Sequence, residues 1–296
     1  MANVPSMGNA IVSVRGLAGP VRSTSGADMR TLSTVSLSNV QQVYSGAEGQ
    51  LWELLMGEQI HIGGLTSSMD LAQRAAIASR SRGVDLCCCT GAGMRFLVRF
   101  RDVAHMQGID ATGAMVDLGR QRCADEGLAD RIDFKLAQAT DTGLPSDAYD
   151  FVWGEDAWCY VADKQALIRE AARLVPVGGT IAFTDWCEGP AGLTDQQAIR
   201  FMAFMKFPSF CTLDDYAGLL QSHGCRVVEA TDTGRFGEYV DLYIQMVGKQ
   251  LTYDALKLLN FDQQLLGAIG GELAYVQQLV CEKRIVQGRF IARRAE

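Results

Sequence analysis

The chain has 296 residues, of which 48% are hydrophobic, and its net charge is −7 at pH 7. This composition indicates an ordinary globular protein with a sizeable core. An acidic balance argues against nucleic acid as the main partner, because phosphate binding needs a basic surface. No apolar run approaches the roughly 18 residues of a membrane span. Neither nucleic acid nor a membrane is therefore predicted as a partner, and a small molecule is favoured.

The cysteines and histidines have no spacing typical of a metal site. Apart from the run at 87–89, no two of the 9 cysteines are close enough to form a C-x-x-C pair, and the 3 histidines are widely separated. Metal ligands and disulfide frameworks in proteins recur at short, regular spacings. We therefore predict no metal, reduced thiols and a cytoplasmic location.

The first 82 residues lack an α/β pattern. Residues 1–40 are rich in small and polar residues and predict a weakly ordered arm, and its early arginines leave a targeting segment open. Apolar residues then recur at helical spacing over 43–57, and a second helix is expected over 67–80. Residues 41–82 are thus predicted as an N-terminal helical cap.

From residue 83 onward, predicted strands and helices alternate. The strands are expected at 84–89, up to 110, and at 132–137, 150–153 and 180–186, with helices at 94–101, 113–126 and 164–175 between them. Such alternation predicts an α/β fold with a mostly parallel sheet covered on both faces. Ligands of such sheets bind at the carboxyl ends of the strands.

Two later stretches interrupt this alternation. Residues 188–222 and 248–280 are helical in pattern, and the chain ends in a strand, I-V-Q-G-R-F-I-A. Both stretches follow the strands that end at the ligand edge. We therefore predict one domain over 83–296 that carries helical lid segments at 188–222 and 248–280.

Two glycines and one aspartate suggest a nucleoside site. Gly91 and Gly93 follow a strand and open a helix, which lets backbone N–H groups approach a polar ligand. Asp110 ends the second strand, where a carboxylate can accept both hydroxyls of a ribose. The third small residue of the dinucleotide fingerprint is replaced by Phe96, so a nucleoside without pyrophosphate fits better than NAD.

These residues carry a family resemblance. V-D-L-C-C-C-T-G-A-G resembles the first motif of class I S-adenosylmethionine-dependent methyltransferases, and segments around 143–158 and 173–180 follow in the family's order. The segments G-E-Q-I-H-I-G-G-L and E-D-A-W-C-Y-V-A-D-K resemble the sarcosine/dimethylglycine N-methyltransferase group. The resemblance implies a Rossmann-like fold with a seven-stranded, mostly parallel sheet, and S-adenosyl-L-methionine as the cofactor.

The resemblance also implies roles for single residues at the cofactor. The residues placed around it are Asp85, Cys87, Gly91, Gly93, Asp110, Ala111, Ala139, Thr140 and Glu155. Asp85 and the turn up to Gly93 would face the methionine end, Asp110 the ribose, and Ala111 the adenine. The adenine amine, which the family usually contacts with an Asp, would be contacted by Thr140 or by the next residue, Asp141.

Cysteines stand where the family usually has its first two glycines, at Cys87 and Cys89. A small buried residue explains them, because cysteine fits a tight turn although it lacks the freedom of glycine at positive φ. Capture of a soft atom or an electrophile by these thiols remains the alternative.

Catalytic roles are predicted for Glu155, Asp156 and His61. The resemblance places Glu155 and His61 near the reactive sulfonium, and Asp156 stands beside Glu155 at the carboxyl end of a strand. Carboxylates and imidazoles can steer or accept a proton. An acceptor pocket is predicted from three aromatic residues, Trp158, Tyr160 and Trp186, which are otherwise core residues.

The predicted activity is methyl transfer from S-adenosylmethionine to a small metabolite, foremost an amine or amino acid. Methylation at O, C or S of another metabolite is the alternative within the same class. A noncatalytic nucleoside-binding regulator and a dehydrogenase are the rivals from other classes. A homodimer is left open.

Overall fold

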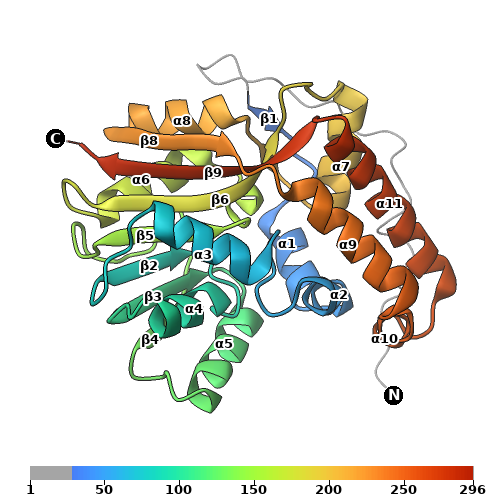
Figure 1. Ribbon diagram of the computed structural model, residues 1–296, viewed down its shortest axis with the longest axis horizontal. Helices are drawn as coiled ribbons and strands as arrows, with labels where there is room; N and C mark the ends of the chain where they lie inside the picture. Colours follow the sequence, from blue (N-terminus) through green and yellow to red (C-terminus); the bar gives the residue numbers. More distant parts are fainter. Residues whose placement is uncertain (1–28, 296) are drawn as a thin grey trace.

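A 7-stranded sheet forms the centre of the protein in the computed structural model, which describes residues 29–295 (Figure 1). The strands are β2 (Arg82–Leu86), β3 (His105–Asp110), β4 (Ile132–Leu136), β5 (Phe151–Glu155), β6 (Thr180–Glu188), β8 (Cys225–Asp232) and β9 (Ile285–Arg294). Their order across the sheet is β4-β3-β2-β5-β6-β9-β8, and neighbouring strands from β4 to β6 are parallel. The predicted Rossmann-like, mostly parallel sheet is confirmed.

The last strand, β9, runs antiparallel to both of its neighbours, β6 and β8. It was predicted as the final strand, and 8 of its 10 residues are buried. The edge strand β8 was not predicted. Its sequence mixes polar and apolar residues without a regular alternation, most of it is only partly buried, and its register shifts between Val227 and Glu229.

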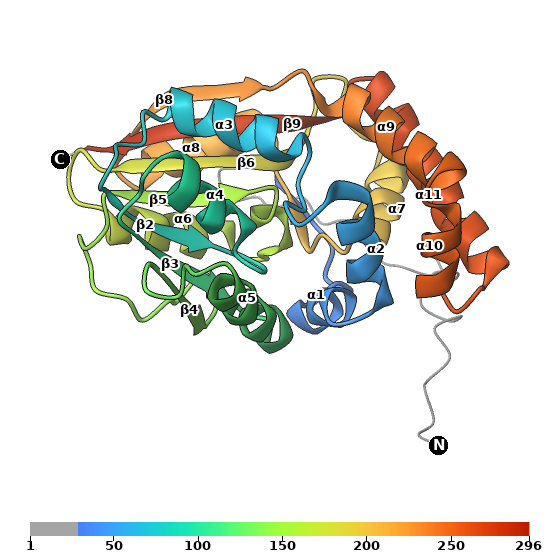
Figure 2. The ribbon, with the colours of Figure 1, turned by 60° about the horizontal axis from the view of Figure 1, so that its bottom comes forward.

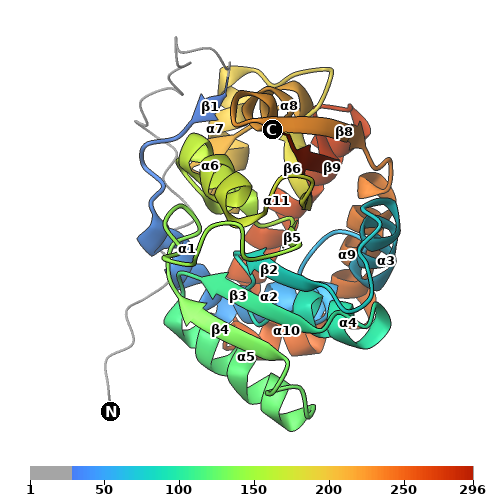
Figure 3. The ribbon, with the colours of Figure 1, turned by 90° about the vertical axis from the view of Figure 1, so that its left-hand side faces the viewer.

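Helices cover both faces of the sheet (Figures 2 and 3). The helices are α1 (Leu37–Tyr44), α2 (Ala47–Met56), α3 (Gly64–Arg74), α4 (Ala92–Phe100), α5 (Gly113–Asp125), α6 (Lys164–Leu174), α7 (Asp195–Met205), α8 (Leu213–Ser222), α9 (Phe236–Lys249), α10 (Thr252–Leu258), α11 (Gln263–Cys281) and the 3-10 turn η2 (Trp158–Tyr160). Side chains of the strands alternate between the faces. Val152 of β5 packs with residues of α6 and α8, whereas Trp153 packs with residues of α3, α4 and α5.

A separate helical layer lies beyond the carboxyl ends of the parallel strands (Figures 1 and 2). Its core combines apolar residues of α2, α7, α9 and α11 with Val43 of α1 and Ala255 of α10. These side chains pack mainly on one another and not on the face of the sheet. The layer therefore stands at the edge where ligands of such sheets bind.

The predicted lid segments divide between this layer and the sheet. Within 188–222, α7 joins the helical layer, whereas α8 packs on α6 and β8. Within 248–280, both α10 and α11 belong to the layer. Most of the predicted arm, 1–40, lies outside the described residues. In its described part, β1 (Arg30–Thr31) pairs with β7 (Ser209–Phe210), and α1 begins at Leu37.

None of the helices within residues 29–295 is both long and apolar enough to cross a membrane.

Candidate functional site

Two adjoining cavities lie at the carboxyl edge of the sheet. The large cavity holds about 230 Å³ and the small cavity about 50 Å³. Four residues line both of them, namely Tyr44, Cys87, Cys89 and Ala157. The two cavities therefore form one continuous cleft along the ends of β2, β3 and β5, where the fold predicts a ligand.

The turn after β2 forms the floor of this cleft. Its backbone enters the left-handed region at Cys87 (φ 64°), Cys89 (φ 48°) and Gly91 (φ 75°), at every second residue. A left-handed conformation is strained for any residue with a Cβ atom. The two cysteines therefore occupy positions whose backbone suits glycine, as the sequence comparison with the family implied.

The thiols of this turn are poor nucleophiles. Burial, with the nearby carboxylate of Asp110, raises the pKa of Cys87 and Cys88 well above the usual value and raises the pKa of Cys89 to about 12. The thiolate is the reactive form of cysteine. A small side chain in a tight turn therefore explains these residues better than capture of an electrophile.

Asp110 ends β3 at the large cavity. Its carboxylate accepts hydrogen bonds from the backbone N–H groups of Cys89 (2.9 Å) and Thr112 (2.8 Å). Burial raises the pKa of Asp110, and these backbone donors oppose the rise. Ala111, Ala139 and Thr140 line the same cavity. The predicted ribose and adenine residues are thus brought together on one wall.

Asp85 and Glu155 converge on the start of α4, at the small cavity. A Cβ atom at Gly93 would lie 2.7 Å from Oε2 of Glu155 and 3.5 Å from Oδ2 of Asp85. Burial raises the pKa of Asp85 well above its usual value, and the carboxylates of Glu155 and Asp110 raise it further. Among the described residues, no cation or hydrogen-bond donor offsets this rise. This end of the cleft is therefore suited to a cationic group.

Glu155 is held by three neighbours at the small cavity. Its Oε1 accepts a hydrogen bond from the hydroxyl of Ser68 (2.7 Å), and its Oε2 accepts one from Trp153 Nε1 (3.0 Å). His61 Nε2 lies 3.4 Å from Oε1 of Glu155 and 3.2 Å from the Ser68 hydroxyl. Glu155 and His61, both predicted as catalytic, are therefore neighbours and line the same cavity.

Asp156 faces away from the cleft and lines neither cavity. Its carboxylate accepts from the backbone N–H of Ile62 (2.8 Å) and from Nε2 of Gln287 (2.8 Å). Burial raises its pKa, and nearby His61 lowers it. Asp156 thus joins the loop before α3 to β9, which is a structural use of this carboxylate.

The three predicted acceptor aromatics lie in different surroundings. Tyr160 lines the large cavity, and its hydroxyl accepts a hydrogen bond from Tyr44 (3.1 Å). Trp158 is fully buried, stacks on Phe183 and donates to the Leu86 carbonyl (3.2 Å). Trp186 packs in the core of the helical layer. Gly91 also lines neither cavity, and its role is the turn itself.

Several cleft residues were not predicted from the sequence. Helix α1 covers the large cavity with Leu37, Val40 and Tyr44, and Gln41 donates to the carbonyl of Ala111 (2.7 Å). Ser68 of α3 donates a hydrogen bond to Glu155, and Gln59, in the segment before α3, donates one to the Ser68 hydroxyl (3.1 Å). Leu37 and Val40 fall within the arm, 1–40, that was predicted to be weakly ordered, whereas the structure has them in α1. A single serine or glutamine gives no pattern, so the sequence held no usable signal for these residues.

The glycine-rich turn, the carboxylate after β3 and the cleft between them can be compared with known families. A family model described as a methyltransferase domain matches residues 84–183. This stretch of the chain is therefore similar to a methyltransferase domain. The match begins within β2 and ends within β6, so it covers the part of the sheet that forms the cleft. The resemblance to class I methyltransferases is confirmed.

Solved structures with this fold include two methyltransferases. A putative sarcosine dimethylglycine methyltransferase from Galdieria sulphuraria is 20% identical, with a TM-score of 0.69, over 78% of this chain and 86% of that one. Phosphoethanolamine N-methyltransferase 2 of Haemonchus contortus, in complex with phosphomonomethylethanolamine and S-adenosylhomocysteine, is 16% identical, with a TM-score of 0.76, over 86% of this chain and 59% of that one. At these identities the two structures show a shared fold.

Curated relatives extend beyond this chain. A probable tocopherol O-methyltransferase from rice (Oryza sativa subsp. japonica) is 23% identical over 219 residues, covering 64% of this chain and 60% of the relative. The chain spans 41 to 60% of the length of the first three curated relatives that it matches.

Proposed function

We propose that the protein is an S-adenosylmethionine-dependent methyltransferase that acts on a small metabolite. The observation that carries the proposal is the continuous cleft, with Asp110 on the wall of its large cavity and Asp85 and Glu155 at its small cavity. A carboxylate at the end of the second strand suits ribose hydroxyls. The buried carboxyl group of Asp85, which no cation or hydrogen-bond donor among the described residues offsets, suits the ammonium group at the methionine end of the cofactor. The residues present therefore fit S-adenosylmethionine.

The cofactor supplies the activated methyl group, and the protein's part is alignment and exclusion of water. Methyl transfer needs little covalent help, since holding the reactants in line can supply much of the acceleration. Helix α1 covers the large cavity with Leu37, Val40 and Tyr44, which supports such exclusion. Glu155 and His61 would orient the acceptor or its proton.

An amine without a phosphate group is the acceptor that we favour. The charged side chains lining the small cavity are Glu58, Asp85 and Glu155, together with His61, and those lining the large cavity are Asp110 and Asp163. Acidic groups attract an ammonium group and repel a phosphate. Tyr44 and Tyr160, whose rings meet edge to face, add aromatic surface that also suits a cation. Trp158 lies too deep to do so.

An O-methyltransferase is the second candidate. The relative from rice is named as acting at oxygen. Helix α1 adds Leu37 and Val40 to the large cavity beside the predicted nucleoside residues, and this apolar surface suits an apolar acceptor.

Calorimetry tests cofactor binding first, and an assay with a labelled methyl group then tests turnover. S-adenosylmethionine and S-adenosylhomocysteine should bind, and NAD should not. Turnover should then appear with glycine, sarcosine or dimethylglycine and be weaker with phosphoethanolamine, because the phosphate meets acidic walls. Turnover confined to phenols would refute the amine as acceptor and favour the O-methyltransferase. If neither S-adenosylmethionine nor S-adenosylhomocysteine binds, the methyltransferase activity itself is refuted.

We further propose a reducing, cytoplasmic location. All 9 cysteines are free, and only Cys281 among them is exposed. Thiols persist in reduced form in such a compartment. A homodimer stays a prediction, for which sedimentation of the purified protein is the measurement.

A further inference from the structure

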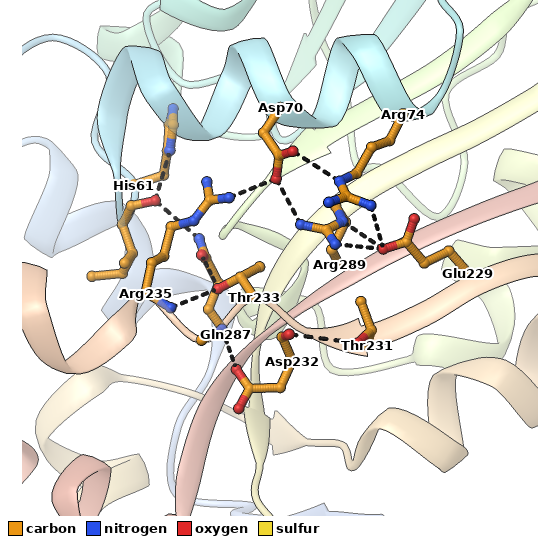
Figure 4. Close-up of polar contacts among 12 residues, drawn as sticks. His61, Asp70, Arg74, Glu229, Thr231, Asp232, Thr233, Arg235, Gln287 and Arg289 are labelled. Atoms are coloured by element: carbon orange, nitrogen blue, oxygen red, sulfur yellow. Dashed lines mark hydrogen bonds and ion pairs between the residues drawn. The ribbon is translucent and has the colours of Figure 1, made fainter.

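A chain of buried hydrogen bonds joins β9 to the loop that carries His61 (Figure 4). Nε2 of the fully buried Gln287 donates to Asp156 (2.8 Å) and to the carbonyl of Ile62 (3.0 Å). Oε1 of Gln287 accepts from the hydroxyl of Thr233 (2.9 Å). The backbone N–H of Ile62 donates to Asp156 in turn (2.8 Å). The peptide groups of Ile62 are thus fixed from both sides, directly after His61.

The chain continues to Glu155 through Ser68. The Ser68 hydroxyl has a single proton, and it donates this proton to Glu155, because a carboxylate can only accept (2.7 Å). The hydroxyl oxygen also lies 3.2 Å from Nε2 of His61. Since the hydroxyl proton is already used, this contact is a hydrogen bond only if Nε2 carries a proton. The other ring nitrogen, Nδ1, lies 3.5 Å from the carbonyl of Ile62, which is longer than an ordinary hydrogen bond. The shorter contact with Ser68 therefore favours a proton on Nε2 of His61.

Helix α3, which carries Ser68, is held from its other side. The Asp70 carboxylate accepts a hydrogen bond from Arg235 (2.6 Å), at the start of α9, and another from Arg289 (2.6 Å), on β9 (Figure 4). Residues two apart in a helix lie roughly 200° apart around its axis. Ser68 therefore points toward Glu155 while Asp70 is anchored on the opposite side of α3, and this anchoring sets the rotation of α3 that brings Ser68 to Glu155.

We propose that Ser68 and Gln287 are positioning residues for the proposed methyl transfer. Gln287 fixes the loop at Ile62, and Ser68 links His61 to Glu155, so that the Glu155 carboxylate keeps one orientation at the small cavity. His61 then serves as a donor at Nε2 and not as the proton acceptor there. The inference rests on the proposed function for its kinetic consequence, but not for the hydrogen-bond arrangement itself.

The chain offers a matched control for Ser68. Ser67 is on the same helix and is equally buried, and its hydroxyl has no hydrogen-bond partner among the described residues. Ser67→Ala and Ser68→Ala therefore remove the same atom from the same kind of surroundings. Only the second removes a member of the chain.

Nitrogen-15 NMR of labelled histidine tests the arrangement without any turnover. The His61 signals are assigned by their loss in His61→Gln. The wild type should show a protonated Nε2 at His61, and Ser68→Ala should shift that signal whereas Ser67→Ala should not. Gln287→Met, which keeps the length and removes the amide, should shift it as well. An unprotonated Nε2 in the wild type would overturn the proposal.

Kinetics test the positioning role. Ser68→Ala should lower kcat about tenfold or more, because one hydrogen bond to a charged group is lost. The acceptor KM should stay within about twofold of the wild-type value. Ser68→Thr should restore most of kcat, because it keeps the hydroxyl. Equal kcat losses in Ser67→Ala and Ser68→Ala would refute the proposal. Absence of turnover in the wild type would refute the proposed function instead, and the NMR signature would still decide the arrangement.

Discussion

Two of the three consecutive cysteines, Cys87 and Cys88, should respond differently to replacement by glycine. Cys87 has a left-handed backbone (φ 64°) and a half-buried side chain. Cys88 is buried, with 6% of its surface exposed, and is not among the left-handed residues. The variants Cys87→Gly and Cys88→Gly therefore share their chemistry and differ in backbone conformation and burial.

The expected difference in unfolding free energy follows from these two properties. At residue 87, glycine relieves about 1–2 kcal/mol of left-handed strain. The greater freedom of the unfolded chain offsets about 0.4–1 kcal/mol of this gain, and loss of the half-buried side chain offsets about another 0.5 kcal/mol. The net change in unfolding free energy is therefore near zero. At residue 88, glycine loses about 1–2 kcal/mol of burial and about 0.5–1 kcal/mol of chain entropy. Cys87→Gly should thus be more stable than Cys88→Gly by about 2–3 kcal/mol.

Urea titration under a reductant measures this difference, because reduced thiols exclude disulfide exchange and the midpoint reports free energy at a constant slope. The wild type and Cys87→Gly should unfold at similar urea concentrations, and Cys88→Gly at a lower one. Equal losses in the two variants would refute the claim that the turn is strained at residue 87.

Three further predictions concern the cleft and the core. Asp110→Ala should weaken S-adenosylmethionine binding by about 1.5–3 kcal/mol in calorimetry, the range for hydrogen bonds to a charged group, and unchanged affinity in a folded variant would remove Asp110 from the site. Gly93→Ala should weaken cofactor binding because its Cβ would lie 2.7 Å from Oε2 of Glu155, whereas Gly267→Ala, with open space around it, should leave binding unchanged; equal affinities would show that Glu155 can move aside. Burial raises the pKa of Asp185 from 3.8 to about 6, against the influence of Lys164, so the folded state binds this proton more tightly and the carboxyl's contribution to stability falls as the pH rises from about 4 to 6. Asp185→Asn should remove up to about 3 kcal/mol of that dependence in unfolding at successive pH values, and parallel curves for wild type and variant would contradict it.

The central sheet was accessible from sequence because its strands are short, apolar and separated by helices of clear periodicity. The strands predicted near 84–89, 132–137 and 180–186 correspond to β2, β4 and β6. The turn after β2 was equally accessible, since glycines and cysteines at alternate positions coincide with the left-handed backbone at Cys87, Cys89 and Gly91. Local chain stiffness and strand order then bring Asp85 and Asp110 to one edge.

The remaining features depend on contacts that are distant in the chain. Asp156 follows Glu155, yet its carboxylate is bonded to Gln287, which is 131 residues away. Trp158 and Tyr160 lie in one 3-10 turn, and only Tyr160 reaches the cleft, because Trp158 stacks in the core on Phe183. Ser68 bonds to Glu155, 87 residues away, from a helix that Arg235 and Arg289 anchor through Asp70. No spacing rule within one segment reports such contacts.

The acidic character of the cleft connects its stability to its ligand. Asp85 is buried near the carboxylates of Glu155 and Asp110, and burial raises its pKa well above the usual value. Without a cation, the cleft therefore keeps a proton on Asp85 or holds uncompensated charge, and either state is unfavourable for the folded protein. A ligand with an ammonium or sulfonium group lets the carboxylate ionise and removes this penalty. The same residues that make the empty cleft unfavourable thus select a cationic ligand, and His61 and Ser68 can serve orientation without having to neutralise the site.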